Sequence, residues 1–228
     1  MTGTEDGMAR VGGTRQVLVV GAGKFGTAVA AELTKQGHEV LVIDDDPEAV
    51  EAVAPYCARA LELDGNDEAA LRDLGVTDFD DAVVAISDPA RAILATLILS
   101  DLGVRHIVAR AQSATEVRIL QRAGNVRPVL VEQAMGRYVA RSLGIGGSVD
   151  LLPVSEDVVV VRIELRDEHA GRTVADVEAI RDGVSVLALQ RGPSVTVTPG
   201  PEMRLAAGDG LVVIGRQQDL EALRLRPS

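Results

Sequence analysis

Between residues 16 and 143, short apolar runs alternate with longer amphipathic stretches. Runs of about five Val- and Ile-rich residues are typical of strands buried on both faces, and the stretches between them have helical length and spacing. This alternation is the signature of right-handed β-α-β units in a parallel sheet. We predict strands at residues 16–20, 39–43, 58–63, 81–86, 105–110 and 128–131, and helices at 24–36, 47–54, 67–74, 89–102, 113–123 and 132–143.

The pattern changes at Gly144-Ile145-Gly146-Gly147-Ser148, a small-residue stretch typical of a linker or hinge. Beyond it, hairpin-like strands with little helix indicate a small α+β domain. We predict strands at 158–165, 184–190, 194–198 and 210–214, and helices at 174–180 and 217–225. The expected organisation is a disordered N-terminus at 1–14, a Rossmann-type α/β domain at 15–143, a linker at 144–150 and a small α+β domain at 151–228.

Composition narrows the class of protein. Hydrophobic residues make up 46% of the 228 residues and aromatic ones only 2%, so the cores must be built from Val, Leu, Ile and Ala. The net charge is −11 and the basic residues are scattered, which argues against a nucleic-acid or anionic-membrane surface. The single cysteine, Cys57, excludes a disulfide within the chain, and we expect it to be a small buried residue.

The chain also lacks the patterns of membrane insertion and export. No apolar run reaches the roughly 18 residues of a membrane span, and the N-terminal segment lacks the apolar core of a signal peptide. We therefore expect a cytoplasmic protein, in which any membrane connection runs through a partner.

The strongest chemical signal is Gly21-Ala22-Gly23-Lys24-Phe25-Gly26, which fits G-x-G-x-x-G between a predicted strand and a predicted helix. Gly21 allows the tight turn, Gly23 lets the backbone approach a phosphate, and Gly26 lets helix and strand pack closely. Unpaired N–H groups at such a helix start favour a diphosphate, and Lys24 adds a charge. The alternative is a turn that needs its glycines only for packing.

Acidic residues follow the second and third predicted strands, at the edge where open α/β sheets bind ligands. Asp44 lies about 20 residues after the loop, where an acid accepts hydrogen bonds from ribose hydroxyls and repels a 2′-phosphate. NADP is thereby disfavoured, and NAD, ADP and ATP stay open. Asp45 and Asp46 precede Pro47, and capping of the helix that starts there is a simpler role for them than ligand binding. Asp64 is a candidate contact of the adenine or ribose, and Asp67 is the expected N-cap of the next helix.

Enzymatic chemistry has little support in the sequence. A dehydrogenase needs a proton donor or acceptor beside its substrate, yet His38 and His106 are expected at the opposite sheet edge and His169 in a turn of the second domain. No G-x-S-x-G, H-E-x-x-H or Walker pattern occurs. A binding protein is favoured, and an NAD-dependent oxidoreductase is the alternative. A redox-responsive repressor lacks the basic helix-turn-helix segment it would need.

The order of these motifs resembles that of the RCK regulators of potassium transport, the cytoplasmic Trk- and Ktr-type subunits that gate a separate membrane channel. The similarity runs from the glycine loop through Asp64-Gly65-Asn66, Arg110-Ala111-Gln112 and Met135-Gly136 to Gly171-Arg172-Thr173-Val174-Ala175-Asp176 and Gly208-Asp209. It implies RCK N-terminal and C-terminal domains and a regulatory subunit that is not an enzyme.

The resemblance also implies a ligand set. ATP/ADP or NAD/NADH would occupy the glycine loop, and Arg110 would lie near the phosphates, with a solvated strand end as its alternative role. Glu132 matches an acid that meets a divalent cation or the neighbouring subunit's nucleotide in some relatives, and a structural role is the alternative. The candidate nucleotide-binding residues are Gly21, Gly23, Lys24, Phe25, Gly26, Asp44, Asp64, Ser87 and Arg110, and the candidate metal ligand is Glu132.

The implied partners are a membrane-embedded potassium transporter subunit and further copies of the chain, as a dimer and an octameric ring. Residues 89–99 and 139–145 are too apolar for a solvated face, so they are either core helices or a subunit interface. The C-terminal domain senses cyclic di-AMP in some relatives. Arg181 and Arg191 are the basic residues near that region, and neither is assigned to it.

Overall fold

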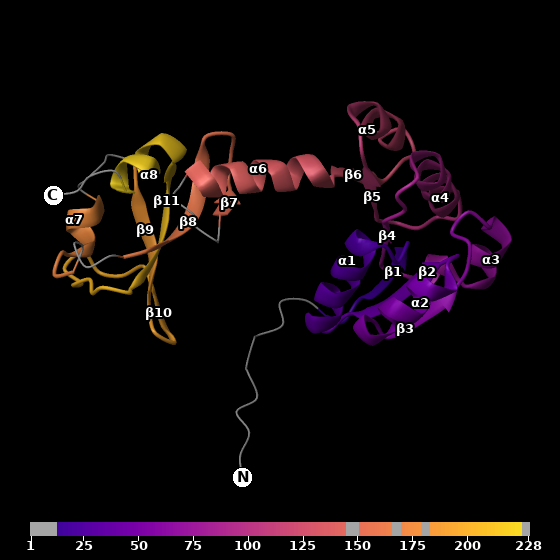
Figure 1. Ribbon diagram of the computed structural model, residues 1–228, viewed down its shortest axis with the longest axis horizontal. Coiled ribbons are helices and arrows are strands. Elements are labelled where there is room, and N and C mark those ends of the chain that lie inside the picture. Colours follow the sequence, from indigo (N-terminus) through magenta and orange to yellow (C-terminus); the bar gives the residue numbers. More distant parts are fainter. Residues whose placement is uncertain (1–12, 145–150, 166–169, 179–182, 225–228) are drawn as a thin grey trace, which may run out of the picture. The chain divides into compact units, whose positions relative to one another are not determined.

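The computed structural model describes residues 13–144, 151–165, 170–178 and 183–224. They form two compact units that divide between Ala134 and Met135, and each unit is described by itself (Figure 1). Residues 1–12 of the predicted disordered N-terminus and residues 145–150 of the predicted linker lie outside the described residues.

The first unit is built on a six-stranded sheet in the order β3-β2-β1-β4-β5-β6, and all neighbouring strands are parallel. This is the strand order of doubly wound dinucleotide-binding folds, so the predicted Rossmann-type domain is confirmed. Its strands are β1 (Gln16–Val20), β2 (Glu39–Asp44), β3 (Arg59–Glu62), β4 (Asp81–Val84), β5 (Ile107–Ala111) and β6 (Val126–Leu130). Its helices are α1 (Lys24–Lys35), α2 (Pro47–Val53), α3 (Glu68–Asp73), α4 (Pro89–Asp101) and α5 (Ala114–Leu120), with single turns η1 (Ala54–Tyr56) and η2 (Val76–Asp78).

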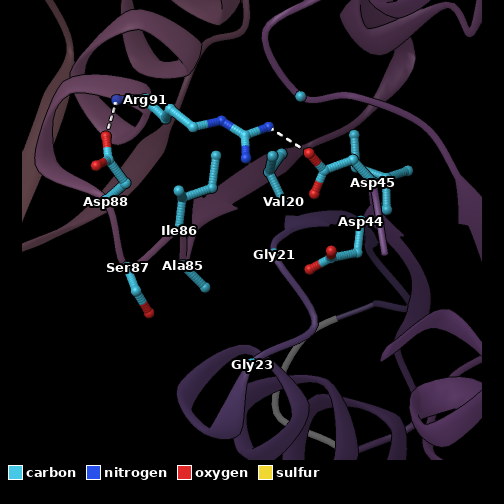
Figure 2. A pocket seen from close by; sticks show the side chains of 12 residues that line it. Val20, Gly21, Gly23, Asp44, Asp45, Ala85, Ile86, Ser87, Asp88 and Arg91 are labelled. Atoms are coloured by element: carbon cyan, nitrogen blue, oxygen red, sulfur yellow. Dashed lines mark hydrogen bonds and ion pairs between the residues drawn. The ribbon is translucent and has the colours of Figure 1, made fainter. Parts of the chain in front are cut away.

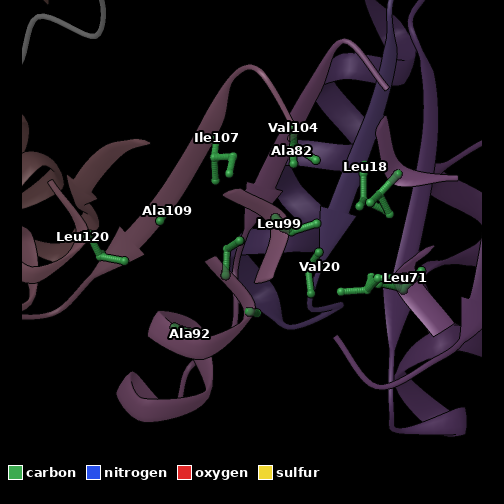
Figure 3. Close-up of a cluster of buried hydrophobic side chains, with 14 of the residues drawn as sticks. Leu18, Val20, Leu71, Ala82, Ala92, Leu99, Val104, Ile107, Ala109 and Leu120 are labelled. Carbon is green, nitrogen blue, oxygen red and sulfur yellow. The ribbon is translucent and has the colours of Figure 1, made fainter. Parts of the chain in front are cut away.

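Alternating side chains of β1 supply two separate cores, one on each face of the sheet. Leu18 and Val20 are fully buried against α3 and α4, whose Leu71 and Leu99 join the same cluster (Figure 3). Val17 and Val19 pack on the other face with residues of α1 and α2. Because helices cover both faces, the ligand-accessible part of the sheet is its edge.

The second unit is a five-stranded antiparallel sheet in the order β10-β9-β11-β8-β7. It confirms the predicted small α+β domain, apart from the unpredicted β7, which is too short for alternation to reveal. Tyr138 of α6 (Val131–Gly144) packs against this unit's core, so the division falls inside that helix and not at Gly144. The other elements are β7 (Leu151–Pro153), β8 (Val158–Glu164), α7 (Val174–Glu178), β9 (Ser185–Arg191), β10 (Ser194–Val197), β11 (Gly210–Arg216) and α8 (Gln217–Arg224).

Arg191 has a structural role in the second unit. Its Nε and Nη2 donate to the two carboxylate oxygens of Asp209 at 2.8 and 2.6 Å, and the backbone N–H of Ala206 donates to the same carboxylate. Asp209 is only 2% exposed, and the Arg191 hydrogen bonds hold its pKa below the ordinary value. The pair ties the end of β9 to the turn before β11. Arg181 lies outside the described residues.

Replacing Asp209 by Asn should lower the free energy of unfolding of the second unit by about 2 kcal/mol at neutral pH, because charged hydrogen bonds are lost. The pKa of Asp209 is lower in the folded protein than the unfolded value of about 3.9. Its contribution is therefore present above about pH 4 and is lost as the pH falls through the lowered pKa. Thermal unfolding followed by circular dichroism from about pH 7 to about pH 3 measures this. Asp157→Asn, at an exposed and longer ion pair, is the control; equal losses in both variants would contradict the assignment.

Candidate nucleotide site at the carboxyl edge of the parallel sheet

The glycine loop joins β1 to α1, and its three glycines meet three different demands. Gly21 has φ +106°, a left-handed conformation that favours glycine. A Cβ on Gly26 would lie 1.9 Å from the carbonyl oxygen of Gly21, so α1 packs directly on the turn. A Cβ on Gly23 would meet nothing within 4 Å. Backbone conformation therefore explains Gly21 and packing explains Gly26, whereas Gly23 leaves the backbone open to an approaching group.

The start of α1 offers unsatisfied donors. Asp46, Asp67, Asp88 and Ser113 accept from backbone N–H groups at the starts of α2, α3, α4 and α5. By contrast, the N-cap of α1 is Gly23, which has no side chain to accept such a bond. The first N–H groups of a helix carry partial positive charge, so this end suits an anionic ligand.

Asp44 ends β2 beside this loop. Its Oδ2 accepts from the backbone N–H of Ala22 at 2.6 Å, and its Oδ1 accepts from the N–H of Asp46 at 3.0 Å. These bonds fix the orientation of the carboxylate. A carboxylate oxygen has more than one acceptor site, so Asp44 retains acceptors for hydroxyl groups of a ribose.

An open cavity of about 240 Å³ lies at this edge of the sheet (Figure 2). It brings together four of the predicted residues: Gly21, Gly23, Asp44 and Ser87. The other five lie outside its lining: Lys24, Phe25, Gly26, Asp64 and Arg110. Lys24 is exposed, Phe25 packs partly buried against the core on the α1 face, and Gly26 lies beneath the loop. The lining residues are Val20, Gly21, Gly23, Ile43, Asp44, Asp45, Gly65, Ala85, Ile86, Ser87, Asp88 and Arg91.

Arg91 was not among the predicted site residues. Its Nη2 donates to Asp45 at 2.7 Å and to Asp64 at 2.9 Å, and the Arg91 hydrogen bond lowers the pKa of Asp45. The prediction that Asp45 caps α2 is therefore wrong, since only Asp46 does so. Asp67 caps α3 as predicted. Asp88-Pro89 is a typical helix start, and it follows β4. This is the sequence signal that could have placed Arg91 in the first turn of α4, at the carboxyl edge of the sheet.

Ser87, Arg110 and Glu132 form a second polar cluster, at the ends of β4, β5 and β6. Arg110 Nη1 donates to Ser87 Oγ at 3.1 Å and its Nη2 donates to Glu132. The hydrogen bond from Arg110 lowers the pKa of Glu132. Arg110 Nε is buried without a hydrogen-bond partner among the described residues, so one donor is unused. Among the residues that the structure describes, no group of three His, Cys, Asp or Glu side chains could hold a metal. To bind a cation, Glu132 would therefore need further ligands from a nucleotide or another subunit.

The remaining candidates lie elsewhere. His38 and His106 directly precede β2 and β5, at the amino edge of the sheet, as predicted, and His169 is outside the described residues. Cys57 is half-buried, its thiol donates to the carbonyl of Arg59, and burial raises its pKa. None of the helices that the structure describes is long and apolar enough to cross a membrane.

The strand order, the uncapped helix start and the acid at the end of β2 define a Rossmann-type domain of the nucleotide-binding class. The family model described as TrkA-N domain matches residues 17–130, and the one described as TrkA-C domain matches residues 158–226. The chain belongs to the TrkA-N/TrkA-C family of the Ktr and Trk potassium uptake proteins.

Similar proteins match the chain almost end to end. Ktr system potassium uptake protein C of Bacillus subtilis is 32% identical over 214 residues, which are 93% of this chain and 97% of the relative. Ktr system potassium uptake protein A of Vibrio alginolyticus is 30% identical, over 91% and 96% of the two chains. Trk system potassium uptake protein TrkA of Mycobacterium tuberculosis is 27% identical, over 91% and 96%.

Two solved structures share the fold. The GsuK channel bound to NAD aligns with a TM-score of 0.61 at 19% identity over 93% of this chain, which spans only 39% of the channel chain. The TrkA-N domain of the inner membrane protein ybaL from Escherichia coli aligns with a TM-score of 0.52 at 19% identity, over 57% of this chain and 97% of that domain.

The glycines of the loop predict contrasting variants. Gly26→Ala should lower the free energy of unfolding of the first unit by about 2–3 kcal/mol, because its Cβ would overlap the Gly21 carbonyl oxygen. Gly23→Ala should change it by less than about 0.5 kcal/mol, because its Cβ meets open space. Urea unfolding of both variants measures the difference, and similar midpoints for the two would contradict the packing argument.

Proposed function

We propose that this chain is a nucleotide-binding regulatory subunit that gates a membrane potassium uptake transporter. The observation that carries the proposal is the uncapped start of α1 beside Asp44, in a chain that belongs to the family over nearly its whole length. The named relatives are potassium uptake proteins, which supports potassium as the transported ion.

The ligand is a nucleotide with an ADP moiety. Its diphosphate binds the N–H groups at the start of α1 and its ribose hydroxyls bind Asp44. ATP/ADP and NAD/NADH share that moiety, and the similar GsuK channel structure was solved with NAD. The carboxylate of Asp44 disfavours the 2′-phosphate of NADP.

Binding alters the second polar cluster. Phosphate groups compete with Glu132 for Arg110, because a phosphate and the Glu132 carboxylate are both anions. Phosphates also accept bidentate hydrogen bonds from arginine. Glu132 lies in the first turn of α6, the helix that crosses the division between the units. Nucleotides that engage Arg110 differently therefore stabilise different states of this helix, which is regulation by population shift. A released Glu132 is then available to a divalent cation.

Regulation and not catalysis is the proposed activity. Hydride transfer needs an acid or base beside the nicotinamide, and His38 and His106 lie at the opposite edge of the sheet. In the second unit Arg191 is engaged by Asp209, so cyclic di-AMP, if it binds there, uses other residues.

The proposed partners are the membrane-embedded transporter subunit and further copies of this chain, assembled as a dimer and an octameric ring at the cytoplasmic face of the membrane. Helix α4 buries Ala92, Ala95 and Leu99 in the core, yet its Leu94 and Leu97 are 47% and 39% exposed. Residues 89–99 thus supply both a core face and an apolar surface suited to a subunit interface.

Replacing Leu94 by Asp should reduce the oligomer to a smaller species, because a charge would be buried in the interface. Size-exclusion chromatography with light scattering measures the mass. Tyr56→Asp, at a half-exposed apolar residue on η1, should leave the mass unchanged. An unchanged mass for Leu94→Asp would remove α4 from the interface.

Asp44→Ala should abolish the rise in melting temperature that ATP, ADP, NAD or NADH produces in the wild-type protein by mass action. Asp46→Ala is a matched control two residues away: it removes the N-cap of α2, which stabilises by about 1 kcal/mol, and should retain the ligand-induced rise. Binding confined to NADH with substrate turnover would instead support the oxidoreductase.

A further inference from the structure

The proposed nucleotide has a base as well as a diphosphate and a ribose. With the diphosphate at the start of α1 and the ribose at Asp44, the base leaves the ribose on the side away from the glycine loop. The cavity continues there, lined by Asp45, Gly65, Ile86 and Arg91. A Cβ on Gly65 would lie 2.3 Å from Val20 Cγ1, so the backbone at Gly65 packs directly on the Val20 side chain.

Arg91 is positioned from three directions. Its backbone N–H donates to Asp88, the N-cap of α4, at 2.8 Å. Its side chain reaches from the start of α4 across to Asp45, which follows β2 (Figure 2). The same Nη2 also donates to Asp64, which follows β3. The guanidinium therefore links three loops at the end of the cavity where the base would lie.

The ion pairs of Arg91 with Asp45 and Asp64 leave part of the guanidinium available to a ligand. Both ion pairs use Nη2, and Nε and Nη1 have no partner among the described residues. The side chain is 41% exposed. A planar guanidinium held at one end offers a flat cationic face to an aromatic ring and free donors to ring nitrogens. The apolar side chains of Ile86 and Val20 line the same cavity and suit the faces of a base.

We propose, resting on the nucleotide site above, that Arg91 is a specificity-determining residue that recognises the base of the bound nucleotide. It stacks on a purine ring while Asp45 and Asp64 hold its plane. A purine presents a larger face than a pyrimidine, so Arg91 favours adenine nucleotides over those with uracil.

Calorimetric titration of the full chain with ADP and UDP tests this, because the two ligands share diphosphate and ribose and differ only in the base. Arg91→Ala should reduce the preference for ADP over UDP about tenfold, with most of the change in ADP affinity. Arg91→Lys keeps the charge between Asp45 and Asp64 without the planar face, so it should lose most of the preference while remaining folded. Arg72→Ala is the control, since Arg72 forms an exposed pair with Glu68 at 2.6 Å on α3, and it should leave both affinities unchanged.

An ADP-to-UDP preference that survives in both Arg91 variants would overturn the proposal, as would equal losses for the two ligands. Wild-type protein that binds ADP but does not distinguish it from UDP would also overturn it while leaving the proposed function intact. Wild-type protein that binds no nucleotide would overturn the proposed function itself.

Discussion

The nucleotide edge depends on one steric constraint: no side chain fits between the end of β1 and the first turn of α1. The Gly21 carbonyl occupies the space that a Cβ on Gly26 would need, so the helix start lies directly over the carboxyl end of the central strand. That proximity lets the Ala22 N–H reach Asp44 on the neighbouring strand. The uncapped N–H groups and the acid thus lie side by side at one end of the sheet.

Both arginines at this edge of the sheet, Arg91 and Arg110, form ion pairs. Arg91 is shared by Asp45 and Asp64, and Arg110 is bound to Ser87 and Glu132. The Arg91 pairs are about half exposed, and such pairs are individually worth little, so a ligand can replace them without a large penalty. Arg110 is more buried, with 17% of its side chain exposed, so a ligand that displaces Glu132 must itself supply an anion to Arg110. Each replacement changes the contacts of a loop or helix start at the sheet edge. A ligand can shift the balance of conformations only through such differences in contacts.

Local pattern predicted much of this architecture, because the apolar runs, glycines and capping residues act over a few positions. Asp46 and Asp67 cap their helices as expected, and the loop glycines have the conformations that their spacing indicates. Arg91 escaped prediction because its partners lie 46 and 27 positions away and meet it only through the strand order. The role of Arg191 depends likewise on Asp209, 18 positions further on, and three-residue β7 is too short for a period to emerge.

The division inside α6 bears on how a nucleotide could affect the second unit. A flexible glycine linker absorbs a displacement, whereas a helix keeps its residues in fixed register. Glu132, in the first turn of α6, is bound to Arg110 at the nucleotide edge, and Tyr138 of the same helix packs in the core of the second unit. Only six positions separate them. We therefore propose that exchange of Glu132 for a phosphate at Arg110 acts on α6, most of whose residues belong to the second unit.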